Sequence, residues 1–162
     1  MLEDIEPEDI IITNGCMEAV ALCLLATVPP GGTVAVEAPT NYSFLQLLKE
    51  LNLMVAEVPT DPQTGLDIQA LERLVHHTRI DACLFMPNFH NPLGCLMPDP
   101  KKEALVAYLN ERTIPIIEDD IHGDLVVAIA TILVARRIVV NAASETLLIL
   151  SVFRRRSLSA FR

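Results

Sequence analysis

The 162-residue sequence lacks several patterns that would assign it at once to a class of protein. Its four cysteines, at positions 16, 23, 83 and 95, include no Cys-X-X-Cys pair, which argues against a zinc knuckle. Because they are scattered singly, they fit a reducing compartment better than a disulfide framework. The longest apolar run, residues 125–135, is too short to span a bilayer, and the acidic N-terminus does not resemble a signal peptide. These absences predict a cytoplasmic protein with no membrane partner.

The sequence is also poor in positive charge. It has 12 Lys and Arg against 21 Asp and Glu, and the net charge of −9 argues against nucleic acid as a direct partner of this segment. Hydrophobic residues make up 51% of the chain, so it is not a disordered tail. Its length is sufficient for one domain with a buried core.

The last part of the chain lacks glycine and proline altogether. Residues 1–125 hold all six glycines and all eleven prolines, with 6 basic against 20 acidic residues. Residues 126–162 carry 6 basic residues and a single acid. A compact domain normally contains turn residues over such a length. We therefore predict a domain over residues 1–125 and an atypical tail over residues 126–162.

Within residues 1–125, strand and helix patterns alternate. Strands are expected at 9–13, 33–39, 53–59, 80–88 and 114–120, and helices at 15–28, 42–52, 66–77 and 101–112. Several of the strands are continuous apolar runs, which is typical of a parallel sheet covered on both faces. The pattern predicts an α/β fold with three layers, α/β/α, and a mainly parallel sheet. Ligands of such sheets bind beyond the carboxyl ends of the strands.

Two motifs lie where a strand runs into a helix. In TNGCMEAV, Gly15 permits a tight turn, and the amides of Cys16 and Met17 would point out of the helix start, where an anion such as phosphate binds. A capped helix without a ligand is the alternative. In EAPTNY, Tyr42 could cover a flat ligand or pack on its own helix.

Two further motifs follow the later strands. In PNFHNPLG, Asn91 precedes a proline, and a cis bond there can aim its side chain at a ligand oxygen; a plain turn is the alternative. In IPIIEDDIHGDL, the side chains of Asp119, Asp120 and His122 could bind a metal. The acids could instead form a phosphoacceptor pocket, pair with a protonated ring nitrogen, or be solvated. A phosphoacceptor pocket needs a lysine late in the chain, and none follows.

Taken together and in this order, five stretches resemble the fold-type I pyridoxal-phosphate enzymes of aminotransferase class I/II. They are TNGCMEAV, VEAPT, VPTDPQTGLD, PNFHNPLGCLMPD and IPIIEDDIHGDL. More narrowly, they resemble the aminotransferase-like domain of MocR-type regulators of the GntR family. The resemblance covers about residues 5–125 and implies a partial large domain, truncated at both ends, with pyridoxal 5'-phosphate as the cofactor.

The resemblance assigns cofactor contacts to individual residues. The backbone amides of Gly15, Cys16 and Met17 would bind the phosphate. Asn91 matches the asparagine that bonds the pyridine 3-oxygen, and Asp119 matches the aspartate that pairs with the pyridinium nitrogen.

Two positions depart from the family pattern. His122 stands where the family has a tyrosine that bonds the same 3-oxygen. The slot of the ring-stacking aromatic is Asn41, with Tyr42 next to it, so Tyr42 is the candidate for stacking.

The family's chemistry also requires a lysine that forms a Schiff base with the cofactor. All three lysines of the chain, Lys49, Lys101 and Lys102, precede Asp119. Family members carry the lysine about 35 residues after the aspartate, in a Ser-Phe-Ser-Lys-Thr-like stretch. This chain has SVFRRRSLS there, at residues 151–159. The sequence therefore predicts no catalytic residue of this kind, no transamination, and at most weak, non-covalent cofactor binding.

A reading-frame shift would explain the missing lysine. Residues 151–158 can be encoded as TCA GTT TTT CGA AGA CGC TCG CTC, which read two bases later gives Ser-Phe-Ser-Lys-Thr-Leu-Ala. The lysine codon then straddles Arg154 and Arg155, at the family's spacing. We therefore hypothesise that residues 126–162 are out-of-frame translation.

For the parent protein, the resemblance implies an amino-acid or amine substrate and a homodimer. A different class of function remains open, namely a non-catalytic domain that senses pyridoxal phosphate or an amino acid within a transcriptional regulator.

Overall fold

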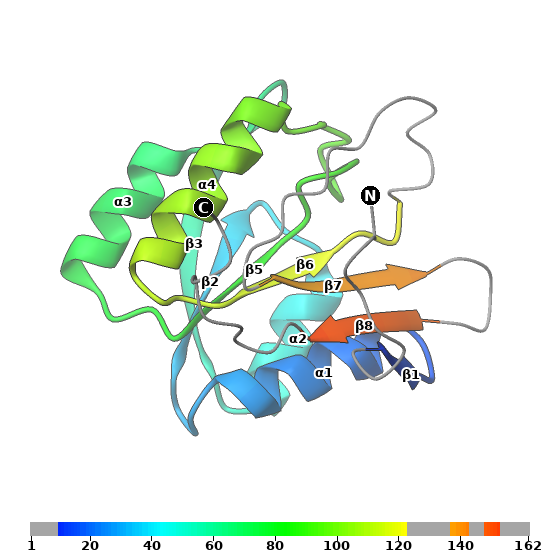
Figure 1. The fold of residues 1–162 in the computed structure, drawn as a ribbon. Coiled ribbons are helices and arrows are strands. Elements are labelled where there is room, and N and C mark those ends of the chain that lie inside the picture. Colours follow the sequence, from blue (N-terminus) through cyan, green and yellow to red (C-terminus); the bar gives the residue numbers. More distant parts are fainter. Residues whose placement is uncertain (1–9, 123–136, 143–147, 153–162) are drawn as a thin grey trace, which may run out of the picture.

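A computed structural model describes residues 10–122, 137–142 and 148–152 (Figure 1). Helices and strands alternate over most of this part, as the sequence predicts. The elements in chain order are β1 (Ile10–Thr13), α1 (Cys16–Thr27), β2 (Thr33–Ala38), α2 (Tyr42–Glu50), β3 (Met54–Asp61), β4 (Gly65–Leu66), α3 (Ile68–His77), β5 (Ala82–Phe85), α4 (Asp99–Glu111), β6 (Ile116–Asp119), β7 (Arg137–Ala142) and β8 (Leu148–Val152). None of these helices is both long and apolar enough to cross a membrane.

The described strands form one eight-stranded sheet in the order β1-β8-β7-β6-β5-β2-β3-β4. The pairs from β3 through β2, β5 and β6 to β7 are parallel, and the pairs β1–β8, β7–β8 and β3–β4 are antiparallel. The prediction of an α/β fold with a mainly parallel sheet is therefore confirmed. The short β4 was not expected from the sequence. It forms a hairpin with the end of β3, in which Asp61 pairs with Gly65.

Two strands come from the range predicted to be an atypical tail. β7 pairs in parallel with β6, and β8 lies antiparallel between β7 and β1. They extend the sheet beyond β6, whereas the division of the chain at residue 125 stays a prediction.

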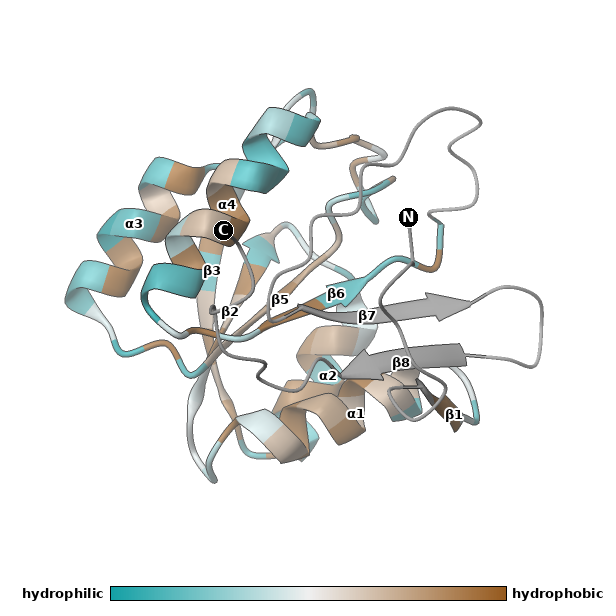
Figure 2. Ribbon diagram, in the orientation of Figure 1, coloured by the Kyte–Doolittle hydropathy of each residue, from teal (hydrophilic) through white to brown (hydrophobic). Residues whose placement is uncertain are grey.

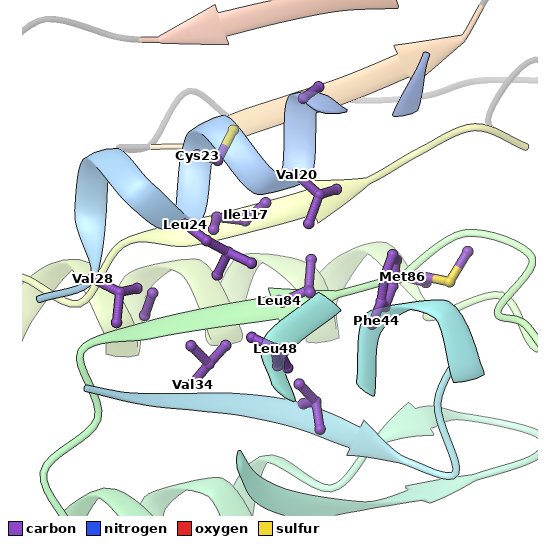
Figure 3. Close-up of a cluster of buried hydrophobic side chains, with 13 residues drawn as sticks. Val20, Cys23, Leu24, Val28, Val34, Phe44, Leu48, Leu84, Met86 and Ile117 are labelled. Atoms are coloured by element: carbon purple, nitrogen blue, oxygen red, sulfur yellow. The ribbon is translucent and has the colours of Figure 1, made fainter. Parts of the chain in front are cut away.

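One face of the sheet is covered by α1 and α2 (Figure 1). Alternate residues of the parallel strands point to this face, among them Val34 and Val36 of β2, Leu84 of β5 and Ile117 of β6. Figure 3 shows how Val20 and Leu24 of α1 and Phe44 and Leu48 of α2 meet them. This fully buried cluster fixes α1 on the sheet, and with it the turn at Gly15.

The residues in between point to the opposite face, which α3 and α4 cover. Ala35, Cys83, Phe85 and Ile116 pack there against Leu71 of α3 and against Leu105 and Leu109 of α4. In Figure 2, α3 and α4 carry hydrophilic residues alongside the hydrophobic ones, as expected for surface helices. The two core clusters make the central strands a rigid platform, buried on both sides.

Candidate functional site

The carboxyl ends of β2, β5 and β6 lie side by side in the sheet, and buried polar atoms without a hydrogen-bond partner gather there. Among the described residues, such atoms belong to Glu37, Thr40, Asn88, His90 and Asp119. All five residues lie in the last two residues of one of these strands or in the segment that follows it. Buried polar groups are nearly always satisfied in folded proteins, so this cluster of exceptions makes the carboxyl edge of the sheet the candidate site.

Asp119, the last residue of β6, is one of the two almost fully buried acids of this cluster. Its side chain is 1% exposed. Oδ1 accepts hydrogen bonds from the backbone N–H of Ile121 at 3.3 Å and from the Cys16 thiol at 3.5 Å, whereas Oδ2 has no partner. Burial raises the pKa of Asp119 above its ordinary value, and the two hydrogen bonds and the nearby His122 counteract this rise. A carboxylate in this position favours a cationic donor at Oδ2.

The start of α1 lies against this carboxylate. Gly15 is the N-cap, with φ +96°, a conformation that favours glycine, and a Cβ added to it would meet nothing within 4 Å. No side chain caps the helix there, whereas Asn41 caps α2 and Asp67 caps α3 with their own oxygens. The first amides of α1 have no acceptor within the helix, so this open end offers N–H groups to an anion.

An acidic side chain also lies at this helix start. Oε2 of Glu18 accepts a hydrogen bond from the backbone N–H of Asn14 at 2.5 Å. The bond satisfies the residue before the N-cap and leaves the amides of Cys16 and Met17 untouched. The exposed Glu18 therefore supports the helix start but places a negative charge beside it.

Asn91 lies in the turn that follows β5. Its side chain is exposed, and the Asn91–Pro92 peptide bond is cis. Backbone hydrogen bonds from His90 to Cys95, from Gly94 to His90 and from Met97 to Pro87 close the turn on both sides of Asn91. The amide of Asn91 is thus presented to solvent by a turn whose backbone is well fixed.

Two polar contacts near this turn were not predicted from the sequence. His90 is fully buried, and its Nε2 lies 3.3 Å from Oε2 of Glu37, which also accepts the backbone N–H of Met86 at 2.7 Å. Asn88 donates its side-chain amide to Oδ1 of Asp120 at 2.7 Å and so joins the segments after β5 and β6. A single charged residue inside the apolar run TVAVEAP was the signal that could have drawn attention to Glu37.

Of the remaining sequence candidates, Tyr42 is 76% exposed at the start of α2. Asn41, which stands in the slot for a stacking aromatic, uses its side-chain oxygen to cap α2 through the N–H of Ser43 at 3.0 Å. His122 is half-buried after β6, close enough for its charge to act on Asp119. The start of α1 and Asp119 are therefore brought together through Cys16, whereas the side chain of Tyr42 is exposed to solvent.

The metal alternative finds no support in the described residues. Within residues 10–122 and the two later strands, no group of three or more His, Cys, Asp or Glu side chains is arranged to hold a metal ion. Asp120 instead accepts the hydrogen bond from Asn88.

The three lysines are engaged elsewhere or exposed. Lys101 donates to the backbone oxygen of Thr64 at 2.9 Å, and Lys102 lies 3.1 Å from Asp99. Lys49 is exposed in the last turn of α2.

Comparisons with known proteins agree on one family. A family model described as aminotransferase class I and II matches residues 2–162. The chain is 42% identical over 118 residues to the uncharacterized HTH-type transcriptional regulator YjiR of Escherichia coli. The aligned region covers 73% of this chain and 25% of that protein. It is 30% identical over 121 residues to 2-aminoadipate transaminase of Thermus thermophilus, covering 75% of this chain and 30% of that protein.

Solved structures share the fold. LysN, an alpha-aminoadipate aminotransferase from Thermus thermophilus complexed with N-(5'-phosphopyridoxyl)-L-leucine, superposes with a TM-score of 0.84 at 23% identity. The superposition covers 93% of this chain and 43% of LysN. The chain thus spans about a quarter of the length of the curated relatives and under half of the solved one.

Proposed function

Because the chain belongs to the aminotransferase class I and II family, we propose that it forms part of a domain that binds pyridoxal 5'-phosphate weakly and without a covalent bond. The observation that carries this proposal is the buried Asp119 carboxylate, whose Oδ2 has no partner. A protonated pyridine nitrogen is a cationic N–H donor of the kind this oxygen lacks. When bound, the cofactor supplies an electron sink for carbanion chemistry at an amino acid.

The other contacts follow from the positions of the side chains. The open start of α1 would hold the phosphate through the amides of Gly15, Cys16 and Met17. The exposed amide of Asn91 would donate to the ring's 3-oxygen, and His122, beside Asp119, would be a second donor there. Tyr42 could cover the ring only if its exposed side chain turned toward the site.

Catalysis of amino transfer is not part of the proposal for this chain. The reaction needs a lysine that bonds the cofactor and moves a proton at the substrate carbon. Lys101 and Lys102 are bound to groups of the hairpin and of α4, and Lys49 is exposed on α2. Residues 151–159 contain arginines at the position where the family's sequence motif has the lysine.

We propose the reading-frame shift as the origin of this difference. Two observations support it. The composition changes after residue 125, and codons possible for residues 151–158 encode a lysine-containing peptide when read two bases later. The DNA of the gene tests it directly. Codons near position 154 that give no lysine in either other frame would refute it.

An absorbance titration with pyridoxal phosphate, followed by borohydride reduction and mass spectrometry, tests the cofactor proposal. We expect a saturable spectral change and no pyridoxyl group on a lysine at substoichiometric cofactor. The Asp119→Asn variant should show the spectral change only at about 10- to 100-fold higher cofactor, whereas Asp99→Asn, which removes a carboxylate from α4, should titrate like the wild type. A stoichiometric pyridoxyl-lysine would contradict the non-covalent proposal, and no saturable change would contradict cofactor binding.

A second candidate is a sensing domain of a transcriptional regulator. The observation that favours it is the higher identity to an HTH-type regulator, 42%, than to a transaminase, 30%. A sensing domain and an enzyme differ in turnover. An amino acid that changes the cofactor spectrum without yielding a keto acid supports the sensor, and a winged-helix coding region upstream in the genome would add to that support.

A further inference from the structure

The side chain of Cys16 makes a contact that its place in the phosphate turn does not require. Cys16 is the first residue of α1, and its Sγ lies 3.5 Å from Oδ1 of Asp119, 103 residues further along the chain. The thiol is therefore the side chain through which the helix start touches the carboxylate at the end of β6.

We propose that the Cys16 thiol is a positioning donor, which occupies Oδ1 of Asp119 and so reserves Oδ2 for the ligand. Its consequence for the cofactor rests on the function proposed above. Two donors, the thiol and the Ile121 N–H, meet Oδ1, and none meets Oδ2. Rotation of the carboxyl group would break both bonds, so the pattern holds the carboxylate in one orientation.

The thiol acts here as a donor and not as a nucleophile. Burial, and next the negative charge of Asp119, raise the pKa of Cys16 well above its ordinary value. The sulfur therefore keeps its proton at neutral pH, and S–H is a donor that carboxylate oxygen accepts.

Cys16 also joins the two halves of the candidate site. Its backbone N–H belongs to the open start of α1, and its side chain reaches the carboxylate that meets the ring nitrogen. One residue thus sets the position of the anion-binding amide relative to Oδ2. A shift of the helix start would move the donor away from Asp119, so both ends of a ligand are held in register.

The experiment compares Cys16→Ser, which keeps a donor, with Cys16→Ala, which removes it at nearly the same size. The readout without cofactor is the pKa of Asp119, followed by carboxyl ¹³C NMR and assigned with Asp119→Asn. Because the hydrogen bond lowers this pKa, it should be higher in Cys16→Ala than in Cys16→Ser. The matched control is Cys23→Ala, which removes a buried thiol from the same helix without a contact to Asp119 and should leave the pKa unchanged.

The second readout is the affinity for pyridoxal phosphate. Cys16→Ala should bind about fivefold more weakly than Cys16→Ser, the ratio expected for one hydrogen bond. Identical Asp119 titrations in the two variants would overturn the inference even if the wild type binds the cofactor. If the wild type binds no cofactor while the titrations differ, the proposed cofactor fails and the thiol contact stands.

Discussion

Asp81 and Asp119 lie at opposite ends of the parallel strands, and both are largely buried. Asp81 precedes β5 at the amino edge, where Oδ2 accepts the N–H of Thr33 at 2.9 Å and Oδ1 lies 2.8 Å from Nε of Arg79. The carboxylate packs so closely that a Cβ on Gly32 would come within 2.9 Å of it. Asp119, at the carboxyl edge, has one oxygen without a hydrogen-bond partner in the part of the chain that the structure describes, and the half-buried His122 lies nearby.

The difference separates an acid whose two oxygens are paired within the fold from one that keeps an oxygen available for the cofactor proposed above. At the amino edge, the chain supplies every partner of Asp81 from the residues next to the strand. At the carboxyl edge, several buried polar atoms lack a hydrogen-bond partner among the described residues. A protein that leaves a buried charge unpaired accepts a cost in stability, which a bound cation can offset.

The largest expected difference between the two aspartates is in ligand binding, when each is replaced by asparagine. Asp119→Asn removes the charge that pairs with a ring N–H, so the affinity for pyridoxal phosphate should fall about 10- to 100-fold. Asp81→Asn should change it by less than about twofold, because the amino edge is remote from the site. Absorbance titrations measure both, and equal losses in the two variants would contradict the assignment.

Stability should respond in the opposite order. Asp81→Ala leaves the partly buried N–H of Thr33 without this acceptor and should lower the free energy of unfolding by about 1 kcal/mol. Asp119→Asn removes a desolvated charge and should leave the free energy of unfolding unchanged or raise it. Urea denaturation of the two variants provides the measurement, and a larger loss for Asp119→Asn would reverse the comparison.

The pH dependence of stability sharpens the contrast further. Burial raises the pKa of Asp119 in the folded state, so the folded chain binds the proton more tightly than the unfolded chain. The contribution of this residue is therefore greatest at low pH and is lost as the pH rises from the unfolded aspartate value through the raised one. We expect the stability difference between Asp119→Asn and the wild type to grow with pH over this window. A stability difference that is constant with pH would show that the pKa of Asp119 is the same in the folded and the unfolded chain.

The smallest effect concerns the negative charge of Glu18 beside the start of α1. Glu18→Gln removes a negative charge from the start of α1, and the affinity for pyridoxal phosphate should rise about twofold at low salt and less at high salt. Glu103→Gln, an exposed change on α4 at the other face, is the control and should have no effect. Weaker binding by Glu18→Gln would show that the support of the helix start outweighs the repulsion.

Much of the architecture was predictable because local pattern and burial agree. The apolar runs around Val34, Leu84 and Ile117 predict strands buried on both faces, and the structure has them in two cores. Strand boundaries differ by a few residues, as for β5, which is shorter than the predicted 80–88. The β4 hairpin was read as a turn because a two-residue strand carries no periodicity.

The site was predictable only in part, since its contacts join residues far apart in sequence. The motif at Asp119 indicated a carboxylate at a strand end, but its contact with Cys16 depends on how α1 lies on the sheet. The same holds for Asn88 with Asp120 and for His90 with Glu37, whose partners are 32 and 53 positions away. Spacing alone cannot reveal such pairs.

The order of the strands also bears on how the chain comes together during synthesis. β1, among the earliest described residues to emerge, has its sheet partner in β8, where Ile10 pairs with Ser151. The ribosome must release the residues of β8 before that pairing is available, whereas β2 and β3 can pair early. Gly15 lies two residues after β1, so the start of α1 keeps one flank unpaired until β8 has been synthesised.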